Sequence, residues 1–520
     1  MKGAVAAGHP LTAEAGARAL AEGGNAVDAA VAAVFVSWVT ESPLTGPGGG
    51  GFMLVHRARD RSERLLDFFV AVPGQGLPVG SRAEMAVADV TFAPGNVQRF
   101  LVGGPSCGVP GAVAGVAEAH AAYGRLPWGK LVRPAVELAR SGVELSPVQA
   151  SLHEILGPIL RWGAETRRIY GDAAAKAGER LRMEDLAATL ELLAEEGPSV
   201  FYRGELARAL VECVQGEGGL LTERDLDSYR VIRRVPVRTG FRGHDFVSNP
   251  PPSSGGVLIA YALRILERLG PAPRAETAAA YTQIAEVMRE AARARDRTFG
   301  RGLYRGGLAA RLLAEETVES AASRIVRGPG SSKPEAAGLP STTHVSAVDE
   351  AGNAVSVSIS TGAGSGVVVP GTGVHLNNML GEEDLVSPGG RFRAPGARLT
   401  SMMSPSLVLR GGEPVLVVGS AGSARLRGAV LQIVVNAVEH GMPVGEAIRA
   451  PRIHLDGARL HLEGGVDAAV ADELERSGYD VVRWAEPNVF FGGASAVARE
   501  EARLAAAGDP RRGGAGVVVA

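Results

Sequence analysis

Hydroxyl and imidazole side chains stand together at residues 341–344, which read Ser-Thr-Thr-His. They open an alternating run that ends at Val348 and is followed by a polar turn at residues 349–353. A second alternating run occupies residues 354–360. Two such runs on either side of an Asp/Gly/Asn turn predict a β-hairpin. The hairpin would carry hydroxyl groups, which are among the side chains that form covalent acyl intermediates in enzymes.

The register of this hairpin decides which hydroxyl groups meet. If Val348 pairs with Ala354, the pairing carried back along both strands places Thr342 directly opposite Ser360. Opposed residues of an antiparallel pair have Cβ atoms about 5 Å apart, so the two hydroxyl groups can interact. We therefore expect Ser360 to support Thr342 by a hydrogen bond across the hairpin. The alternative is a purely structural contact, because threonine is also a good strand residue.

The segment before the hairpin favours a chemical role. Residues 327–341 read RGPGSSKPEAAGLPS, a tether rich in glycine, proline and serine without an apolar period. A loose tether that runs into a buried strand suits a chain that is cut at that point. Cleavage between Ser341 and Thr342 would give Thr342 a free α-amine, whose reference pKa of about 7.7–8.0 lets it act as base for its own hydroxyl.

A series of motifs occurs in order along nearly the whole chain. They are Glu22–Asp28 (EGGNAVD), the Gly48–Gly51 run before Phe52–Leu54, Asn249–Gly256 (NPPPSSGG), Thr342–His344, the Asp349–Asn353 turn, Leu376–Asn378 and Ala450–Arg452. Each motif is weak alone, but the ordered set is specific, and in it the chain resembles the γ-glutamyltranspeptidase (γ-glutamyltransferase) family.

This resemblance implies the α/β (α+β) fold of N-terminal-nucleophile hydrolases, a four-layer αββα sandwich. It also implies a proenzyme that cleaves itself into two fragments. Residues 1–341, which end in the tether 327–341, would form the large subunit. Residues 342–520 would form the small subunit and begin at the nucleophile. Together the two portions would build one composite catalytic domain.

Composition is ordinary for a soluble globular protein. The chain has 520 residues, of which 46% are hydrophobic and 21% charged. The net charge of −2 gives no sign of nucleic-acid binding or of attraction to an anionic membrane. The longest apolar stretch, residues 29–39, is too short to span a bilayer and fits a buried helix capped by Asn25. No signal peptide is visible, so we expect a cytoplasmic protein without membrane partners, although members of the family are often exported.

The sequence predicts neither a metal nor a cofactor. Cys107 and Cys213 have no CxxC spacing and are expected to be buried free thiols. The ten histidines include no HExxH pair, and we expect His454 and His461 to be structural. Walker loops and convincing dinucleotide-binding fingerprints are also missing from the sequence.

Two glycine-rich segments bear on the catalytic centre. Residues 46–51 precede an expected strand at 52–56 and would be either a flexible turn or, as the resemblance implies, backbone that passes close to the nucleophile. Residues 419–423 join a strand to a helix, where free backbone N–H groups can bind an oxyanion. A plain tight turn is the alternative. The resemblance assigns the oxyanion hole to Gly422 and Ser423.

The resemblance also identifies substrate-binding positions, and several of them have lost polar groups. An acid in the loop 381–384, Glu382 or Glu383, would face the substrate's α-amino group. Phe69 stands where the family has an arginine for the α-carboxylate, and Met379 stands where it has an acid or amide. One of the family's paired serines aligns with Met402, or alternatively the pair is Thr400-Ser401. We therefore expect poor turnover of ordinary γ-glutamyl amides, unless Arg393 or Arg398 replaces the missing charge.

Further expectations concern the scaffold around these residues. In residues 250–256 the prolines would stiffen the entry to a helix and the serines would cap it, since no GxSxG elbow is present. The charged helical segment 277–299 would be a solvated face. Other expected helices are 112–141, 183–196 and 204–215, and other expected strands are 64–70, 241–248, 406–409, 414–418 and 517–519.

These observations predict a self-processing amidohydrolase and acyltransferase similar to γ-glutamyltranspeptidase. Thr342 would attack a γ-glutamyl or related amide of a small molecule or peptide, and water or an amine would then remove the acyl group. One alternative is a glutaryl- or cephalosporin-type acylase on the same scaffold, and another is an uncleaved scaffold that only binds. The expected partners are the substrate and the two fragments of the chain, with a higher oligomer left open.

Overall fold

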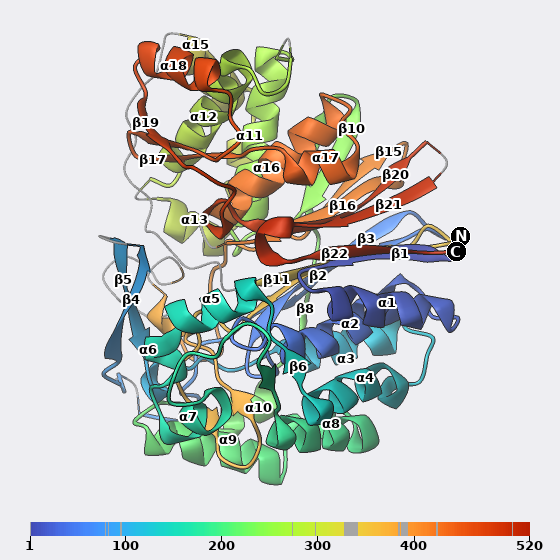
Figure 1. The fold of residues 1–520 in the computed structure, drawn as a ribbon, viewed down its shortest axis with the longest axis vertical. Coiled ribbons are helices and arrows are strands. Elements are labelled where there is room, and N and C mark those ends of the chain that lie inside the picture. The colour runs from blue at the N-terminus through green and yellow to red at the C-terminus, as the bar shows by residue number, and fades with distance from the viewer. Residues whose placement is uncertain are drawn as a thin grey trace.

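The fold is a sandwich of two β-sheets with helices outside each (Figure 1). This arrangement confirms the predicted four-layer αββα architecture. A computed structural model describes residues 2–78, 80–81, 83–93, 96–272, 274–296, 298–326, 342–382, 385, 394–422, 425–501 and 503–520.

The first sheet contains the predicted hairpin at its centre. Its seven strands pair antiparallel throughout. The sheet contains strands from before and from after residue 342, and β1 lies between two of the latter, so both portions of the chain build one sheet. Their order is β22 (Ala515–Val519), β1 (Gly3–Ala7), β11 (Thr343–Asp349), β12 (Ala354–Ser360), β2 (Gly50–Arg57), β3 (Ser62–Phe68) and β8 (Ile232–Arg234).

The second sheet faces the first across the middle of the molecule (Figure 1). Its six strands are also antiparallel, and β16 and β20 pack over β11. Their order is β21 (Arg503–Gly508), β20 (Gly493–Glu500), β16 (Glu413–Ala421), β15 (Ser406–Arg410), β10 (His244–Ser248) and β9 (Val237–Phe241).

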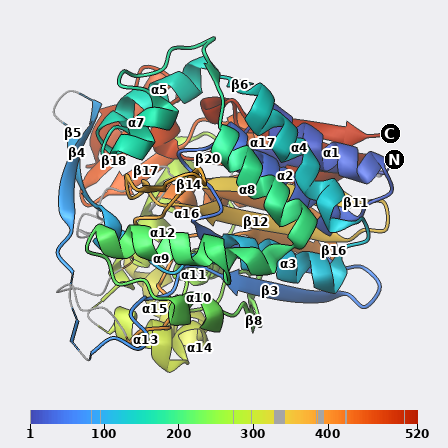
Figure 2. The ribbon, with the colours of Figure 1, turned by 90° about the horizontal axis from the view of Figure 1, so that it is seen from below.

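Helices of the N-terminal part cover the first sheet, and their layer is seen from outside in Figure 2. The innermost is α2 (Ala26–Thr40), every residue of which is buried. Its N-cap is Asn25, as predicted, within a capping box closed by Asp28. The others are α1 (Pro10–Ala21), α3 (Ala112–Tyr123), α4 (Trp128–Ser141), α8 (Glu184–Glu196) and α9 (Glu205–Gly216), with the predicted segment 112–141 split into two helices.

Helices α11 (Gly255–Leu269), α12 (Ala278–Arg293) and α16 (Arg425–Val438) cover the second sheet (Figure 1). The expectation of a solvated face on α12 is wrong. Glu286, Arg289 and Glu290 are buried. Arg289 forms an ion pair with Glu286 at 3.1 Å, and Glu290 pairs with Arg324 of α15 at 2.7 Å. The charges are buried because α15 (Glu315–Val326) and α18 (Ala468–Arg476) pack against this helix.

Smaller elements complete the fold. They are β4 (Ala86–Ala93), β5 (Asn96–Val102), η1 (Gly104–Ser106), β6 (Val143–Glu144), α5 (Pro147–Ile155), α6 (Gly157–Leu160), α7 (Ala164–Tyr170), β7 (Arg180–Leu181), η2 (Pro198–Phe201), α10 (Glu223–Ser228), α13 (Phe299–Arg305), α14 (Leu308–Leu313), β13 (Val368–Val369), β14 (Val374–His375), η3 (Met379–Gly381), α17 (Val444–Arg449), β17 (Ile453–Asp456), β18 (Arg459–Leu462), β19 (Asp480–Arg483), η5 (Val489–Phe491) and η6 (Pro510–Arg512).

The two chain ends lie side by side (Figure 1) because β22 pairs with β1, which in turn pairs with β11. The predicted C-terminal strand is therefore present. The segment before it contains the short 3₁₀ helix η6. The pairing puts Ala515, at the start of β22, beside Ala7 and so close to the start of β11, where the predicted nucleophile lies, whereas Val519 lies toward the other end of β11.

Candidate active site

The hairpin has the register that the sequence predicts. Strands β11 and β12 pair from Thr343 with Ile359 to Val348 with Ala354. One further step in this register brings Thr342 opposite Ser360. Both residues are buried, and the Ser360 hydroxyl accepts a hydrogen bond from the backbone N–H of Gly362 at 2.8 Å. A hydrogen bond between Ser360 and Thr342 stays a prediction, and Ser341 lies outside the described residues.

The glycine run passes against this hairpin as closely as the sequence suggested. Gly50 pairs with Ser360 across strands β2 and β12. A Cβ atom at Gly49 would lie 2.3 Å from the Ser360 carbonyl oxygen, and one at Gly51 would lie 2.2 Å from that of Ser358. Real Cβ atoms do not approach backbone oxygens so closely, so only glycine lets the two strands meet here.

Asn377, from the Leu-Asn-Asn motif, fixes the same glycine run from the other side. Its side-chain Nδ2 donates hydrogen bonds to the carbonyls of Gly48 at 2.8 Å and Gly108 at 3.0 Å. Its Oδ1 accepts a hydrogen bond from the Gly108 N–H at 3.0 Å. The amide thus satisfies buried backbone groups of two segments, and its role is to hold the loop that backs the hairpin.

Arg512 binds the predicted nucleophile residue directly, a contact that the sequence did not reveal. Its Nη1 donates a hydrogen bond to the carbonyl oxygen of Thr342 at 2.6 Å. The guanidinium is buried, and burial lowers its pKa while the charges of Glu41 and Asp509 act in the opposite direction. No spacing or motif marks this arginine, because only the pairing of the chain ends brings η6 to the hairpin.

Glu41 is a second residue that sequence reasoning missed. It follows α2 and is buried. Its Oε2 accepts a hydrogen bond from the Thr343 hydroxyl at 2.6 Å, and a Cβ atom on Gly8 would lie 2.4 Å from the same oxygen. Burial raises the pKa of this carboxyl, whereas the charge of Arg512 and the hydroxyl hydrogen bonds lower it. The side chain therefore forms a tight polar contact at the start of β11.

His344 lies between the two sheets and is a structural residue. Its Nδ1 is 2.8 Å from the Ser358 hydroxyl, and its Nε2 is 3.1 Å from that of Ser346, which in turn donates to the Ser495 carbonyl of the second sheet. A Cβ atom at Gly419 would lie 2.2 Å from the ring. Burial lowers the pKa of His344 to about 3, so the imidazole stays neutral at working pH.

Buried histidines predict a loss of stability in mild acid. Burial lowers the pKa of His9, His153 and His375 to about 4 and that of His344 to about 3. Between these values and the unfolded pKa near 6.5, the unfolded chain binds more protons than the folded one. Stability is therefore complete above about pH 6.5 and falls as the pH drops toward 4. Each histidine adds a slope of up to about 1.4 kcal/mol per pH unit.

The measurement is the midpoint of thermal unfolding from pH 7.5 to 4. The matched variant is His153→Gln, because Nδ1 of His153 is buried and has no hydrogen-bond partner among the residues that the structure describes. Replacement removes one titrating group at little structural cost, so the decline toward low pH becomes shallower. A decline of unchanged steepness in this variant would contradict the assignment.

The segment expected to bind the oxyanion lies close to the hairpin. Strand β16 ends at Ala421, and Gly422 follows with φ of +135°, a conformation that favours glycine. Ala421 lies close to Thr343, His344 and Arg512, so the end of β16 meets the start of β11. Ser423 lies outside the described residues. The oxyanion role of Gly422 and Ser423 stays a prediction.

Phe69 and Met379 lie together in one buried apolar cluster with Val70, Leu380 and Met403. Phe69 also stacks on Phe52 with ring centroids 5.3 Å apart. The positions where the family would place polar groups for the substrate are thus occupied by packed apolar side chains. The assignment of Phe69 and Met379 to the substrate pocket stays a prediction.

Arg398 is committed to other partners. Its Nε lies 3.3 Å from Asp67 Oδ1, and its guanidinium stands over the Tyr229 ring at 4.3 Å. The side chain is buried. Arg398 is therefore already paired with Asp67 and is not a free cation that could bind a substrate carboxylate. Arg393, the other possible replacement, lies outside the described residues.

The serines before α11 do not cap it, and that prediction is wrong. Ser254 is the N-cap residue but makes no side-chain cap. Its hydroxyl donates to the Ser401 carbonyl at 3.1 Å and lies 2.9 Å from Met402 Sδ, while Ser253 donates to the carbonyls of Ser401 and Met403 at 3.0 Å each. Buried loop carbonyls need donors, and these serines supply them. The motif therefore holds Ser401 and Met402 in place.

Glu382 lies near the end of the hairpin. Its Oε1 accepts a hydrogen bond from the backbone N–H of Ala363 at 3.2 Å and lies next to Gly362, two residues beyond Ser360. This position is compatible with the expected contact to a substrate amino group, which stays a prediction. Glu383 is outside the part of the chain that the structure describes.

Within the described ranges, no group of three or more His, Cys, Asp or Glu side chains is placed to hold a metal ion. Cys107 is buried as expected, whereas Cys213 is only partly buried. No helix among these residues is long and apolar enough to cross a bilayer. His454 and His461 face each other across β17 and β18 beside Phe490, in agreement with a structural role.

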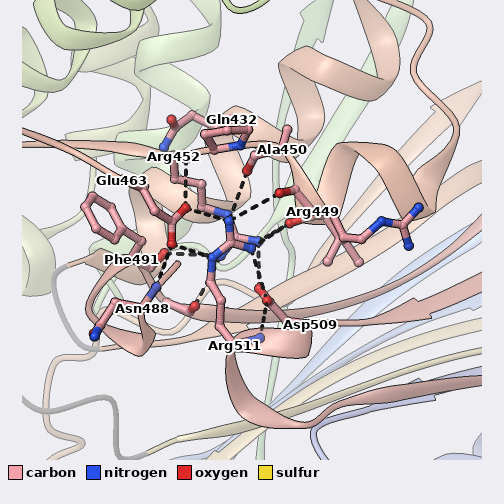
Figure 3. Close-up of polar contacts among 12 residues, drawn as sticks. Gln432, Arg449, Ala450, Arg452, Glu463, Asn488, Phe491, Asp509 and Arg511 are labelled. Carbon is pink, nitrogen blue, oxygen red and sulfur yellow. Dashed lines mark hydrogen bonds and ion pairs between the residues drawn. The ribbon is translucent and has the colours of Figure 1, made fainter. Parts of the chain in front are cut away.

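A buried ion-pair network holds η6 in place (Figure 3). Arg452 pairs with Asp509 at 2.7 Å, and Arg511 pairs with Asp509 at 3.1 Å and with Glu463 at 2.5 Å. All four side chains are buried. The network fixes the turn from which Arg512 reaches Thr342, so it supports the site without touching it.

Comparisons with known proteins identify the family to which this chain belongs. The γ-glutamyltranspeptidase family model matches residues 12–519. The acylase ACY 1 proenzyme of Pseudomonas sp. strain SE83 is 34% identical over 513 residues, which cover 96% of this chain and 90% of that protein. The glutathione hydrolase proenzyme of Pseudomonas aeruginosa is 33% identical over 546 residues, with 99% and 94% covered. The crystal structure of cephalosporin acylase from Bacillus halodurans has a TM-score of 0.85 and 26% identity, and the match covers 99% of this chain and 95% of that one. The chain therefore belongs to the γ-glutamyltranspeptidase family of N-terminal-nucleophile hydrolases.

Proposed function

We propose that this chain cuts itself between Ser341 and Thr342 and then cleaves a substrate amide through a threonyl acyl-enzyme. The observation that carries the proposal is the register of β11 and β12, which leads to Thr342 opposite Ser360 at the end of the described hairpin. Family membership supports it, because the relatives are proenzymes of amide-cleaving enzymes. The glycine run packs closely against the hairpin, Asn377 holds that run by hydrogen bonds, and Arg512 binds the Thr342 carbonyl. These contacts fix the position of the hairpin, as a nucleophile requires.

Self-cleavage would begin with the Thr342 hydroxyl. Its Oγ1 attacks the carbonyl carbon of Ser341, the peptide C–N bond breaks, and the hydroxyl proton passes to the departing nitrogen. The result is an ester between Ser341 and the Thr342 side chain. Water hydrolyses this ester, which releases the Ser341 carboxylate and leaves Thr342 with a free α-amine and a free hydroxyl.

Turnover would use both new groups. The neutral amine takes the proton of Oγ1 as the oxygen attacks the substrate carbonyl, and backbone N–H groups at Gly422 and Ser423 hold the oxyanion. The amine then gives the proton to the leaving nitrogen of the substrate, and an acyl-enzyme forms. Water or an acceptor amine attacks this ester by the same steps in reverse and frees the enzyme.

The two fragments would stay together after the cut. Residues 342–520 supply β11, β12 and β22 of the first sheet, and residues 1–341 supply β1, β2, β3 and β8. Strand β1 lies between β22 and β11, so the pieces interleave. Separation would expose a whole sheet of unpaired backbone groups, at a high cost in free energy. The proposed active enzyme is therefore a complex of large and small subunits.

The acyl group of the substrate would be less polar than γ-glutamyl, or differently charged. Phe69 and Met379 belong to a buried apolar cluster, Met402 is held beside Ser401, and Arg398 is paired with Asp67. An apolar Met379 in place of an acid or amide favours an acyl chain without the α-amino group, such as glutaryl, whose terminal carboxylate corresponds to the α-carboxylate of γ-glutamyl. The likeness to an acylase proenzyme supports this second candidate specificity on the same chemistry.

A panel of acyl p-nitroanilides tests this specificity. We expect kcat/KM for the glutaryl compound to exceed that for the γ-glutamyl compound by roughly ten- to hundredfold, since a lost charged hydrogen bond costs about 1.5–3 kcal/mol. The variant Met379→Gln should move the ratio toward γ-glutamyl, and Met379→Leu, its apolar control, should not. Selective turnover of the γ-glutamyl compound by the unmodified enzyme would show the specificity to be wrong.

A further inference from the structure

Two buried charged side chains flank Thr342 and Thr343, and the chemical steps above do not use them. Arg512 donates to the Thr342 carbonyl at 2.6 Å, and Glu41 accepts from the Thr343 hydroxyl at 2.6 Å. They come from opposite ends of the chain, one after α2 and one from η6. Both line one buried cavity with a volume of about 20 Å³, so water screens their charges poorly.

Three histidines and one further carboxylate also lie around this pair. His9 and His153 line the same cavity, and His344 follows Thr343 on β11. Burial lowers the pKa of these histidines to about 4, 4 and 3, so they are neutral near pH 7. Asp509, which precedes η6, is paired with Arg452 and Arg511.

The charges of Arg512 and Glu41 affect the pKa of the proposed catalytic base, the Thr342 amine. The amine that cleavage would create belongs to Thr342 itself, the residue whose carbonyl Arg512 binds. A fixed positive charge so near disfavours the protonated amine and lowers its pKa, whereas an ionised carboxylate favours protonation and raises it. Unit charges roughly 10 Å apart at an effective dielectric constant of about 20 still interact by about one pKa unit.

We propose that Glu41 and Arg512 act as a charge pair that sets the basicity of the Thr342 amine. Arg512 positions residue 342 and makes its amine a weaker base, and ionised Glu41 offsets part of that effect through its bond to Thr343. Neither is a catalytic residue in the strict sense, because both act through the neighbouring threonines. This inference rests on the proposed function, in which Thr342 is the nucleophile and its amine the base.

The test is the pH dependence of kcat/KM for an acyl p-nitroanilide, whose acidic limb reports the amine of the free enzyme. Glu41→Gln keeps an acceptor for the Thr343 hydroxyl but removes the negative charge. We expect its acidic limb to move to lower pH by about 0.5 unit or more. Arg512→Gln removes the positive charge. The acidic limb of the cleaved portion of this variant should move to higher pH.

Thr343 offers a second, milder probe if Glu41→Gln fails to fold or to cleave. Thr343→Val removes the hydrogen bond that stabilises ionised Glu41. The acidic limb of this variant's kcat/KM profile should therefore move to lower pH, as in Glu41→Gln, but by a smaller amount. Thr343→Ser restores the hydroxyl and should restore the wild-type profile. Glu286→Gln, at a buried ion pair of α12, should leave the profile unchanged.

The outcomes separate this inference from the proposed function. An unshifted limb in both Glu41→Gln and Thr343→Val, or a shift to higher pH in either, would overturn the charge-pair role. An unmodified chain that remains uncleaved and inactive would overturn the proposed function instead. A loss of kcat at all pH values without a displaced limb would mean that Glu41 is only structural, and the inference would be wrong.

Discussion

Thr342→Ala is expected to leave a single chain of 520 residues without amidase activity. Without Oγ1 the Ser341 carbonyl has no internal nucleophile, so the acyl shift cannot begin. The same atom would carry the acyl group in each turnover, and removal of a covalent nucleophile abolishes the chemical step. Intact-mass measurement reports the cleavage, and hydrolysis of an acyl p-nitroanilide reports the activity.

Two variants serve as controls for Thr342→Ala. Thr342→Ser retains a hydroxyl and should still give two fragments, 1–341 and 342–520, at a reduced rate. Thr239→Ala removes a buried threonine on β9, at the far edge of the second sheet, and should cleave normally. Two normal fragments from Thr342→Ala would exclude Thr342 from the mechanism, and an intact wild-type chain would favour the binding-scaffold alternative.

Asp509→Asn should destabilise the protein strongly and impair its cleavage. Asp509 accepts from both Arg452 and Arg511 in the network of Figure 3, and from the backbone N–H of Ala494 at 3.0 Å. The neutral amide leaves two buried guanidinium groups facing the single carboxylate of Glu463. Breaking a buried ion pair by removal of one partner costs about 3–5 kcal/mol. The turn that carries Arg512 to Thr342 would also loosen.

Thermal unfolding and the fraction of cleaved chain measure the two effects. The charge-balanced double variant Arg511→Met with Glu463→Gln leaves Arg452 paired with Asp509, so it should unfold at a higher temperature than Glu463→Gln alone. Arg483→Ala breaks an exposed pair with Asp472, which water and salt screen, and should leave the unfolding temperature nearly unchanged. An Asp509→Asn protein as stable as the Arg483→Ala control would contradict the role assigned to the network.

Local patterns in the sequence were sufficient to predict the hairpin and the helix start that form the scaffold of the site. The hairpin register follows from the alternation on either side of one turn, and the start of α2 follows from the box of Asn25 and Asp28. The glycine run at residues 48–51 was correctly expected to pass near the hairpin, although that expectation rested on the family resemblance. The hairpin register and the helix start depend on neighbours in sequence, where side-chain period and turn chemistry fix the geometry.

Two of the wrong expectations concern what packs over an element. A row of charged residues on α12 suggests a solvated face, but α15 and α18 cover it and its charges pair internally. Serines at the start of α11 suggest caps, but the loop around Ser401 lies close, and the serine hydroxyls donate hydrogen bonds to its carbonyls instead. Periodicity shows which residues share a face and carries no information on which distant segment covers it.

The sequence by itself determined the nucleophile candidate, its opposed hydroxyl and the fold that carries them. The tertiary structure alone decided how that nucleophile is held. Arg512 reaches Thr342 across 170 residues, and Thr343 reaches Glu41 across 302. These contacts exist because β22 pairs beside β1 and because α2 packs beneath β11. No local preference of Glu41 or Arg512 encodes such partners, since a buried charge acquires its partner only when the layers assemble.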